Sequence, residues 1–339
     1  MSIFSYISGV GGLALSAQER VLFEERPPWG AILFARNIET PEQVAGLVAD
    51  IRQVLGRADA PVLIDQEGGR VQRLRPPHWP AYPPAKLFAD IYRNDARSGL
   101  RAAWTGGRLI GEDLHALGIN VDCLPVADIG FAQTHAVIGD RAYGDNVGQV
   151  VELAAAAADG LMQAGVLPVL KHIPGHGRAT ADSHLELPVV RASHEELAET
   201  DFAAFAGLHH LPMAMTAHIV YADIDAEHPA TTSAKVIGEI IRGEIGYDGL
   251  LMSDDLSMKA LKGPFDERTA QALEAGCDVV LHCNGDIEEM RMVACGACVL
   301  GGEAGARARR ALDAANRIAC DTSALREAFA ALTGYGEVT

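Results

Sequence analysis

Short runs of apolar residues recur along the chain, and helical periodicity follows most of them. The run 30–34 (GAILF), for example, precedes 41–55, where apolar residues return every three or four positions. That spacing predicts an amphipathic helix with one buried face. The expected buried face consists of Val44, Leu47, Val48, Ile51 and Leu55. Counting a weak first run, we predict eight strands, at 6–10, 30–34, 61–64, 119–124, 166–170, 212–220, 249–252 and 278–281.

Strands that are apolar throughout are buried on both faces, as the strands of a parallel sheet are. Eight strands that alternate with helices favour a (β/α)8 TIM-type barrel over a doubly wound sheet. No Gly-x-Gly-x-x-Gly follows an early strand, which also argues against a dinucleotide-binding fold. We therefore expect an α/β chain with a single catalytic barrel domain over 1–339 and additional C-terminal helices.

The segments between the strands carry their own signals. Helices are expected at 97–117, 147–164, 233–241 and 267–275, and Ser193 with Glu196 forms a candidate capping box. The stretch 73–88 (RLRPPHWPAYPPAKLF) is too rich in proline for regular structure and is expected to be an irregular excursion on the surface.

Charge and cysteine content narrow the partners and the compartment. The 28 basic and 45 acidic residues give a net charge of −17, which argues against binding nucleic acid or an anionic membrane through bulk charge. No targeting signal or membrane-spanning run is visible, and the six cysteines do not resemble a secreted disulfide framework. Cys295 and Cys298 spell a CxxC without a second pair, so we interpret them as small buried hydrophobic residues. We expect a cytoplasmic monomer.

Titratable residues stand where nearly every predicted strand ends. The carboxyl ends of the strands form the catalytic face of a barrel, so these residues are expected to line one pocket. They are Asp65, Asp122, Lys171, His172, His218, Asp254 and Asp255.

The stretch 171–188 (KHIPGHGRATADSHLELP) carries three histidines and two glycines, Gly175 and Gly177, directly after a strand. A metal site is one interpretation. However, His172 and His176 are separated by Pro174 and Gly175, which disfavour a zinc-binding helix, and the first strand carries no His-x-His. We therefore expect no metal and no cofactor.

Four segments, in order along the chain, resemble glycoside hydrolase family 3, and within it the single-domain β-N-acetylglucosaminidases. They are DQEGGRVQRL (65–74), IGDRAYGDN (138–146), KHIPGHG with the following Asp-Ser-His, and LLMSDDLSM (250–258). Ile173 stands where the family usually has Phe, an apolar exchange. The resemblance extends from about residue 9 to residue 302.

The resemblance implies a role for each matching residue. Asp254 matches the nucleophile, although composition alone does not separate it from Asp255. His184 matches the general acid/base, and Asp182 matches its partner. The residues that match those holding the terminal sugar are Asp65, Arg73, Arg141, Lys171 and His172.

These roles describe a retaining glycosidase, in which a carboxylate attacks the anomeric carbon and forms a covalent glycosyl-enzyme. Histidine can give and then take a proton near neutral pH, and Asp182 would orient its ring. Gly175 and Gly177 suggest that the loop moves His184 over the bound sugar. The substrate that the resemblance implies is a terminal β-linked N-acetylglucosamine on peptidoglycan (muropeptide) fragments, as in cell-wall recycling.

Two alternatives remain open. A histidine acid/base does not repel an incoming anion, so the sugar could pass to phosphate in place of water. The chain could also be a sugar-binding sensor on a barrel scaffold, although a sensor has no need of a nucleophile.

Overall fold

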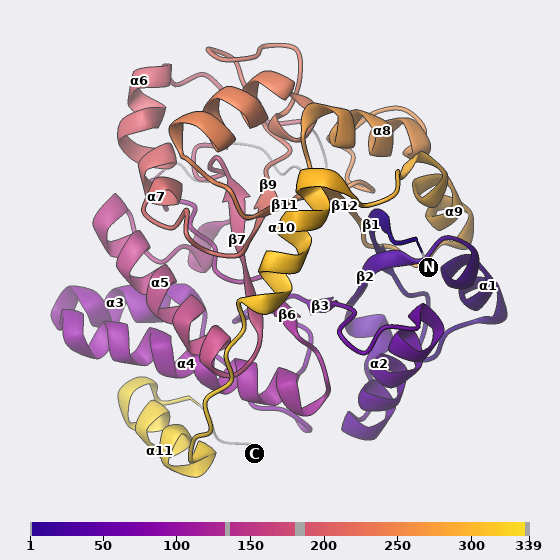
Figure 1. Cartoon of the computed structure of the whole chain (residues 1–339). Helices are drawn as coiled ribbons and strands as arrows, with labels where there is room; N and C mark the ends of the chain where they lie inside the picture. The colour runs from indigo at the N-terminus through magenta and orange to yellow at the C-terminus, as the bar shows by residue number, and fades with distance from the viewer. Residues whose placement is uncertain (1, 133–135, 180–186, 336–339) are drawn as a thin grey trace.

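Eight parallel strands form a closed barrel in the computed structural model, which describes residues 2–132, 136–179 and 187–335. Helices surround the barrel, and α10 (Gly302–Asp313) crosses in front of its strands in Figure 1. In order around the barrel, the strands are β1 (Phe4–Gly9), β12 (Val279–His282), β11 (Leu250–Asp255), β9 (Met213–Thr216), β7 (Leu167–Ile173), β6 (Val121–Asp122), β3 (Val62–Ile64) and β2 (Pro28–Leu33). The pairing of β2 with β1 closes the ring.

The predicted TIM-type fold and the eight predicted strands are confirmed, with shifted ends. The largest shift concerns 212–220, which was predicted as one strand. The barrel strand β9 ends at Thr216, and β10 (Val220–Tyr221) pairs instead with β8 (Val189–Val190) outside the barrel. A further small pair, β4 (Gln66–Gly68) with β5 (Val71–Gln72), follows β3.

The helices begin where the sequence offers capping residues. In α2 (Pro41–Leu55), the Thr40 hydroxyl accepts a hydrogen bond from the Gln43 amide, and Gly56 ends the helix with a positive φ of 63°. Its buried face is the predicted one. Ser193 likewise accepts from the amide of Glu196 at the start of α6. The other helices are α1 (Ala17–Glu25), α3 (Ala85–Asn94), α4 (Ala96–Ala116), α5 (Val147–Gln163), α6 (His194–Leu197), α7 (Ala203–Ala206), α8 (Phe265–Ala275), α9 (Ile287–Gly296), α10 (Gly302–Asp313) and α11 (Thr322–Thr333). A π-helix, Val236–Glu244, occupies most of the predicted helix 233–241.

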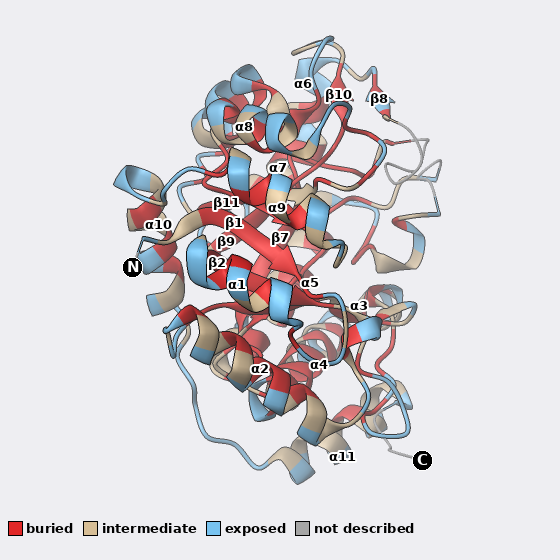
Figure 2. Ribbon diagram, turned by 90° about the vertical axis from the view of Figure 1, so that its right-hand side faces the viewer, coloured by how far each residue is buried: buried red, intermediate tan, exposed pale blue. Residues whose placement is uncertain are grey.

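The strands separate two apolar cores. In Figure 2 the strands of the barrel are coloured as buried and lie at the centre of the molecule. One core lies between the strands and the surrounding helices, and the other fills the barrel. Ala308 and Ala311 of α10 pack against the core inside the barrel. Arg310 of the same helix donates to the Asp248 backbone oxygen just before β11 begins. Helix α10 therefore covers the N-terminal end of the barrel and leaves the opposite end for a site.

Two sequence interpretations are wrong in whole or in part. The stretch 73–84 is irregular, as expected, but it does not lie only on the surface, because Trp79 and Tyr82 within it are buried, and the expected irregular stretch ends where α3 begins at Ala85. Cys295 and Cys298 are exposed, not buried. Helix α9 ends at Gly296, between the two cysteines, so neither faces the apolar side of a continuous helix.

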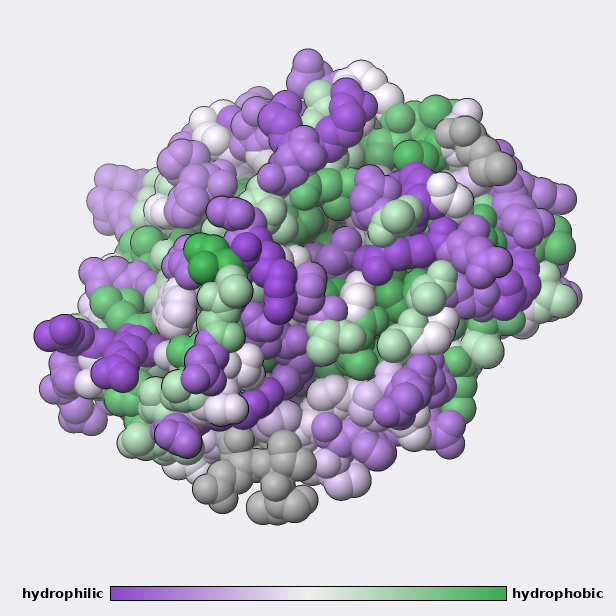
Figure 3. All heavy atoms as spheres, turned by 60° about the horizontal axis from the view of Figure 1, so that its bottom comes forward, coloured by the Kyte–Doolittle hydropathy of each residue, from purple (hydrophilic) through white to green (hydrophobic). Residues whose placement is uncertain are grey.

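The surface in Figure 3 is a mosaic in which hydrophilic side chains predominate and hydrophobic ones are scattered among them. Within the described ranges, none of the helices has the length and apolar character that crossing a membrane requires.

Candidate active site

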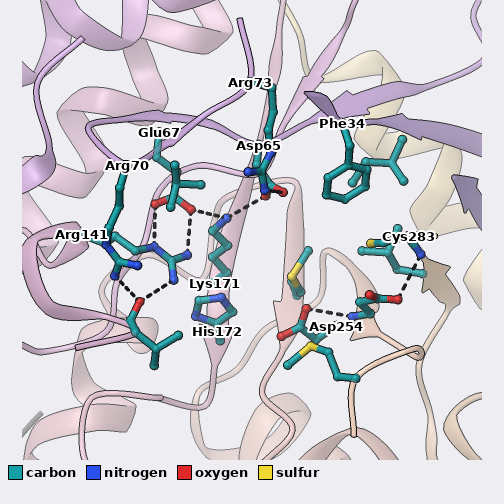
Figure 4. A pocket seen from close by; sticks show the side chains of 17 residues that line it. Phe34, Asp65, Glu67, Arg70, Arg73, Arg141, Lys171, His172, Asp254 and Cys283 are labelled. Carbon is teal, nitrogen blue, oxygen red and sulfur yellow. Dashed lines mark hydrogen bonds and ion pairs between the residues drawn. The ribbon is translucent and has the colours of Figure 1, made fainter. Parts of the chain in front are cut away.

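A pocket of about 210 Å³ lies at the carboxyl ends of the strands (Figure 4). Most side chains that line it come from strand ends or from the loops directly after them, as expected for a barrel. Six of the eight site residues predicted from the sequence line it: Asp65, Arg73, Arg141, Lys171, His172 and Asp254.

The Lys171 ammonium is the centre of a charged network. Its Nζ atom lies 2.6 Å from Glu67 Oε1 and 3.2 Å from Asp65 Oδ1. Arg141 holds the Glu67 carboxylate with two hydrogen bonds of 2.8 Å, from Nε and Nη2. Arg73 donates to Asp65 Oδ2 at 2.9 Å. Figure 4 shows these groups side by side, with Lys171 between the two carboxylates. Paired, bidentate contacts of this kind hold buried charges in one geometry.

Mutual pairing keeps the members of this network charged. Burial alone would raise the pKa of Glu67, but Arg141 and Lys171 outweigh it and lower that pKa to about 2. Burial would likewise raise the pKa of Asp65, yet Lys171 and Arg73 hold it below its ordinary value. For Lys171, burial would lower the pKa, and the two carboxylates raise it instead. The pocket therefore presents fixed ionic donors and acceptors near neutral pH.

A buried carboxylate behind the pocket orients His172. Asp128 Oδ2 lies 2.7 Å from His172 Nδ1, and Asp128 Oδ1 accepts from the backbone amides of His172 and His176 at 3.2 and 2.6 Å. An ionised carboxylate only accepts, so Nδ1 carries a proton and donates it to Asp128, and in a neutral ring Nε2 would then be the acceptor. Because His172 lines the pocket, this tautomer sets the hydrogen bonds that a ligand can make with the ring.

The two adjacent acids at the end of β11 differ in their surroundings. The Asp255 carboxylate accepts from the backbone amides of Ser257 and Cys283, both at 3.0 Å, and from the Ser257 hydroxyl. Asp254 Oδ1 accepts from the Asp255 amide at 2.8 Å, and its side chain lines the pocket on the side away from Arg141 and Glu67 (Figure 4). Asp255 also borders the pocket, but its Oδ1 accepts from backbone amides of two loops and its Oδ2 accepts from the Ser257 hydroxyl.

Two of the titratable residues at the strand ends do not line the pocket. Asp122 is fully buried, where its Oδ1 accepts from the Gln66 amide at 2.9 Å. Burial raises its pKa well above the ordinary value, so it is a poor ionic contact. His218 is also buried, between the Thr231 hydroxyl at 2.7 Å and the Asp255 carbonyl oxygen at 3.0 Å. Both residues therefore lie behind the pocket, where their hydrogen bonds hold the strand ends in place.

The predicted acid/base pair, Asp182 and His184, lies outside the described residues, and so does the part of the loop that carries it. The structure places the start of this loop: Tyr221 donates to the Gly175 carbonyl at 2.6 Å. Over the ranges that the structure describes, no three His, Cys, Asp or Glu side chains are grouped as metal ligands would be.

Sequence reasoning missed Glu67 and Asp128. Glu67 stands inside the DQEGGRVQRL segment that carried the resemblance, so the sequence did point to it. Asp128 has no such signal, because it follows β6 by several residues and reaches His172 only through the fold.

Comparisons with known proteins identify the family. Residues 16–317 match the glycosyl hydrolase family 3 N-terminal domain. A β-hexosaminidase of Alkalilimnicola ehrlichii is 41% identical over 280 residues, which cover 81% of this chain and 79% of that protein. A β-hexosaminidase of Methylococcus capsulatus is 39% identical over 277 residues, 80% of each chain.

Solved structures agree with the sequence relatives. NagZ from Neisseria gonorrhoeae, in complex with N-trifluoroacetyl-D-glucosamine, matches with a TM-score of 0.88 and 31% identity over 98% of both chains. A family 3 β-N-acetylglucosaminidase from Paenibacillus sp. matches with a TM-score of 0.84 and 32% identity, over 97% of this chain and 67% of that one. With most of its length matched by the family and with the barrel in common, the chain belongs to glycosyl hydrolase family 3.

Proposed function

We propose that this protein is a retaining exo-β-N-acetylglucosaminidase that removes terminal β-linked N-acetylglucosamine. The observation that carries the proposal is the position of Asp254, at the end of β11 in a pocket lined by paired ionic groups. The β-hexosaminidase relatives and the NagZ structure bound to an N-acylglucosamine analogue support the sugar specificity.

In the first chemical step, the Asp254 carboxylate attacks the anomeric carbon and the leaving group departs, which forms a covalent glycosyl-enzyme. Asp255 is the less suitable nucleophile, because attack would require its oxygens to leave two backbone amides and a hydroxyl. This contrast supports the choice that the resemblance implied.

His184, with Asp182 as its partner, supplies the acid/base function in this proposal. The imidazolium protonates the departing oxygen, and the neutral ring then takes a proton from the water that attacks the glycosyl-enzyme and releases the Asp254 carboxylate. Asp182 stabilises the charged ring, as the acid member of a triad does.

The sugar is held by the ionic side of the pocket. Asp65, Arg73, Arg141, Lys171 and His172 offer charged donors and acceptors whose positions are set before a ligand arrives. A sugar hydroxyl both donates and accepts, so it can bind between a carboxylate and an ammonium or guanidinium group. The physiological substrates in this proposal are N-acetylglucosamine-containing muropeptides, hydrolysed in the cytoplasm during cell-wall recycling.

The decisive experiment compares chromogenic β-N-acetylglucosaminide and β-glucoside as substrates for wild type and His184→Ala. We expect the N-acetylated substrate to be strongly preferred. We expect His184→Ala to lose most of its turnover when the phenol that leaves is only weakly acidic. Absence of turnover with any aryl N-acetylglucosaminide would contradict the proposal and favour the sensor alternative.

Transfer to phosphate is the second candidate within the same chemistry. Rates in phosphate and in a non-phosphate buffer, with the products identified, separate the two reactions. Free N-acetylglucosamine as the product in both buffers supports hydrolysis, whereas the 1-phosphate in phosphate buffer would replace it with phosphorolysis.

A further inference from the structure

Arg70 borders the pocket that holds the sugar in the proposed reaction, and its guanidinium contacts the segment that leads to Arg141. Its Nη2 atom lies 2.7, 2.6 and 3.3 Å from the backbone carbonyl oxygens of residues 136, 137 and 138. Its Nε atom donates to Asp140 Oδ1 at 3.1 Å. One side chain thus holds most of this irregular segment through its backbone oxygens.

The Val137 carbonyl oxygen is shared by two guanidinium groups, which lie together in Figure 4. It accepts from Arg70 Nη2 at 2.6 Å and from Arg141 Nη1 at 3.0 Å. A carbonyl oxygen has two lone pairs, so it can accept both hydrogen bonds. The other two nitrogens of Arg141, Nε and Nη2, hold the Glu67 carboxylate at 2.8 Å. Arg70 therefore fixes an oxygen that helps to orient the Arg141 guanidinium.

The turn that carries Arg70 is itself held in place. Arg70 stands between β4 and β5, directly after Gly69, which has a positive φ of 56°. The Gly69 amide donates to the Tyr82 carbonyl oxygen at 2.8 Å. Strand β4 of the same hairpin carries Glu67. The hairpin therefore reaches Arg141 by two routes, directly through the Glu67 carboxylate and indirectly through Arg70 and the segment 136–140.

We propose that Arg70 is a positioning residue for the sugar pocket, and that it acts on the bound sugar through Arg141. The segment 136–140 occupies the Nε and Nη2 atoms of Arg70, so these donors serve the protein backbone and not a ligand. Without Arg70, the Arg141 side chain would be less ordered in the free protein. Binding a sugar would then include the cost of ordering that side chain, which weakens affinity. The inference rests on the proposed glycosidase function, because Arg141 affects turnover only if the pocket binds the sugar.

The test is a double-mutant cycle of Arg70→Ala, Arg141→Ala and the double variant, with kcat and KM measured on a chromogenic β-N-acetylglucosaminide. We expect Arg70→Ala to lower kcat/KM about tenfold, the size of one charged hydrogen bond. The loss should come from a higher KM, because the bound sugar orders Arg141 again. Arg141→Ala should lose more, since it removes a contact with the sugar. The double variant should be no slower than Arg141→Ala, because Arg70 acts through Arg141.

Three further variants sharpen the result. Arg70→Lys should keep part of the wild-type kcat/KM, since an ammonium group can donate to some of the same carbonyl oxygens. Arg141→Lys keeps a charge beside Glu67 and replaces Arg141→Ala in the cycle if urea unfolding shows that Arg141→Ala does not fold. Arg20→Ala is the matched control and should keep the wild-type kcat and KM. The Arg20 side chain is 41% exposed against 45% for Arg70, and it pairs with Asp50 away from the pocket.

Losses that multiply in the double variant would overturn the inference, because Arg70 would then act on the sugar or on the fold independently of Arg141. An unchanged kcat/KM in Arg70→Ala, or a loss confined to kcat, would overturn it as well. In each of these outcomes wild type still hydrolyses the chromogenic substrate, so the proposed function stands. If folded wild-type protein did not hydrolyse that substrate, the proposed function itself would fail, and the role of Arg70 would fail with it.

Discussion

At the scale of single residues, the two adjacent acids Asp254 and Asp255 have the same chemistry and different surroundings. Backbone amides from two loops occupy Asp255, whereas Asp254 faces the pocket. A carboxylate that holds a loop by hydrogen bonds and one that attacks a substrate respond differently to replacement by an amide. An asparagine keeps much of the shape needed for those hydrogen bonds but has no anionic oxygen for nucleophilic attack.

Asp254→Asn should therefore lower kcat on the order of 10³-fold or more, with little change in the urea midpoint of unfolding. Steady-state rates and urea unfolding curves measure the two quantities. Near-normal turnover in Asp254→Asn would transfer the nucleophile role to Asp255.

Asp128 should matter for stability as well as for the site. Asp128→Ala removes the acceptor for the His172 ring and for two backbone amides, all of them buried. Unpaired buried donors cost about 1–3 kcal/mol each, so with three of them we expect the free energy of unfolding to fall by about 3 kcal/mol or more. Asp128→Asn keeps an acceptor oxygen and should lose less. Equal losses for the two variants in urea unfolding would contradict this account.

At the scale of elements, α4 and α5 approach so closely that glycine is needed where they meet. A Cβ atom at Gly107 of α4 would lie 2.2 Å from the Ala157 carbonyl oxygen of α5, and one at Gly160 would lie 2.3 Å from the Trp104 carbonyl oxygen. These contacts are with backbone, which cannot rotate away as a side chain can. At these two positions helix propensity favours alanine, whereas the close packing of the two helices favours glycine.

Gly107→Ala should destabilise the protein by about 1–3 kcal/mol, because the steric cost exceeds the gain in helix propensity. Gly46→Ala in α2 is the matched control, since that position is exposed and a Cβ there meets nothing within 4 Å. It should stabilise by up to about 1 kcal/mol. Thermal or urea unfolding of the two variants measures both effects, and a shift in the same direction would refute the packing argument.

At the scale of the whole molecule, the charged network joins strand ends that are far apart in the sequence. Arg141 and Glu67 are separated by 74 residues, and Lys171 and Asp65 by 106. The network thus holds β3, β7 and the loop after β6 together at the open end of the barrel, while α10 covers the other end. Its protonation state affects the stability of the fold as well as the affinity for sugar.

The contribution of Glu67 to stability should depend on pH with a definite sign. Its pKa is about 2 in the folded protein and ordinarily 4.5, so its contribution is complete above pH 4.5 and is lost as the pH falls toward 2. The pKa of its partner Lys171 is raised above the ordinary 10.5, so that contribution is complete below pH 10.5 and is lost as the pH rises beyond it. The difference in unfolding free energy between wild type and Glu67→Gln should therefore be greatest between these limits, at about 3 kcal/mol. Urea unfolding across the pH range measures it, and a difference that does not shrink below pH 4.5 would contradict the ion-pair explanation.

The sequence by itself determined the features that depend on local periodicity and on motifs. The eight apolar runs predicted the barrel, and the spacing in 41–55 predicted the buried face of α2, because burial against one surface imposes its period on the chain. Motifs identified the family and named six residues that the structure brings to one pocket.

Only the tertiary structure decided matters that depend on contacts between distant segments. It separated Asp254 from Asp255 through the amides of Ser257 and Cys283, and it buried Asp122 behind the site. It also brought Asp128 to His172, buried the rings of Trp79 and Tyr82, and left Cys295 exposed. Hydrogen bonds and burial are set by whatever packs against a residue in space, and no local pattern in the sequence records those neighbours.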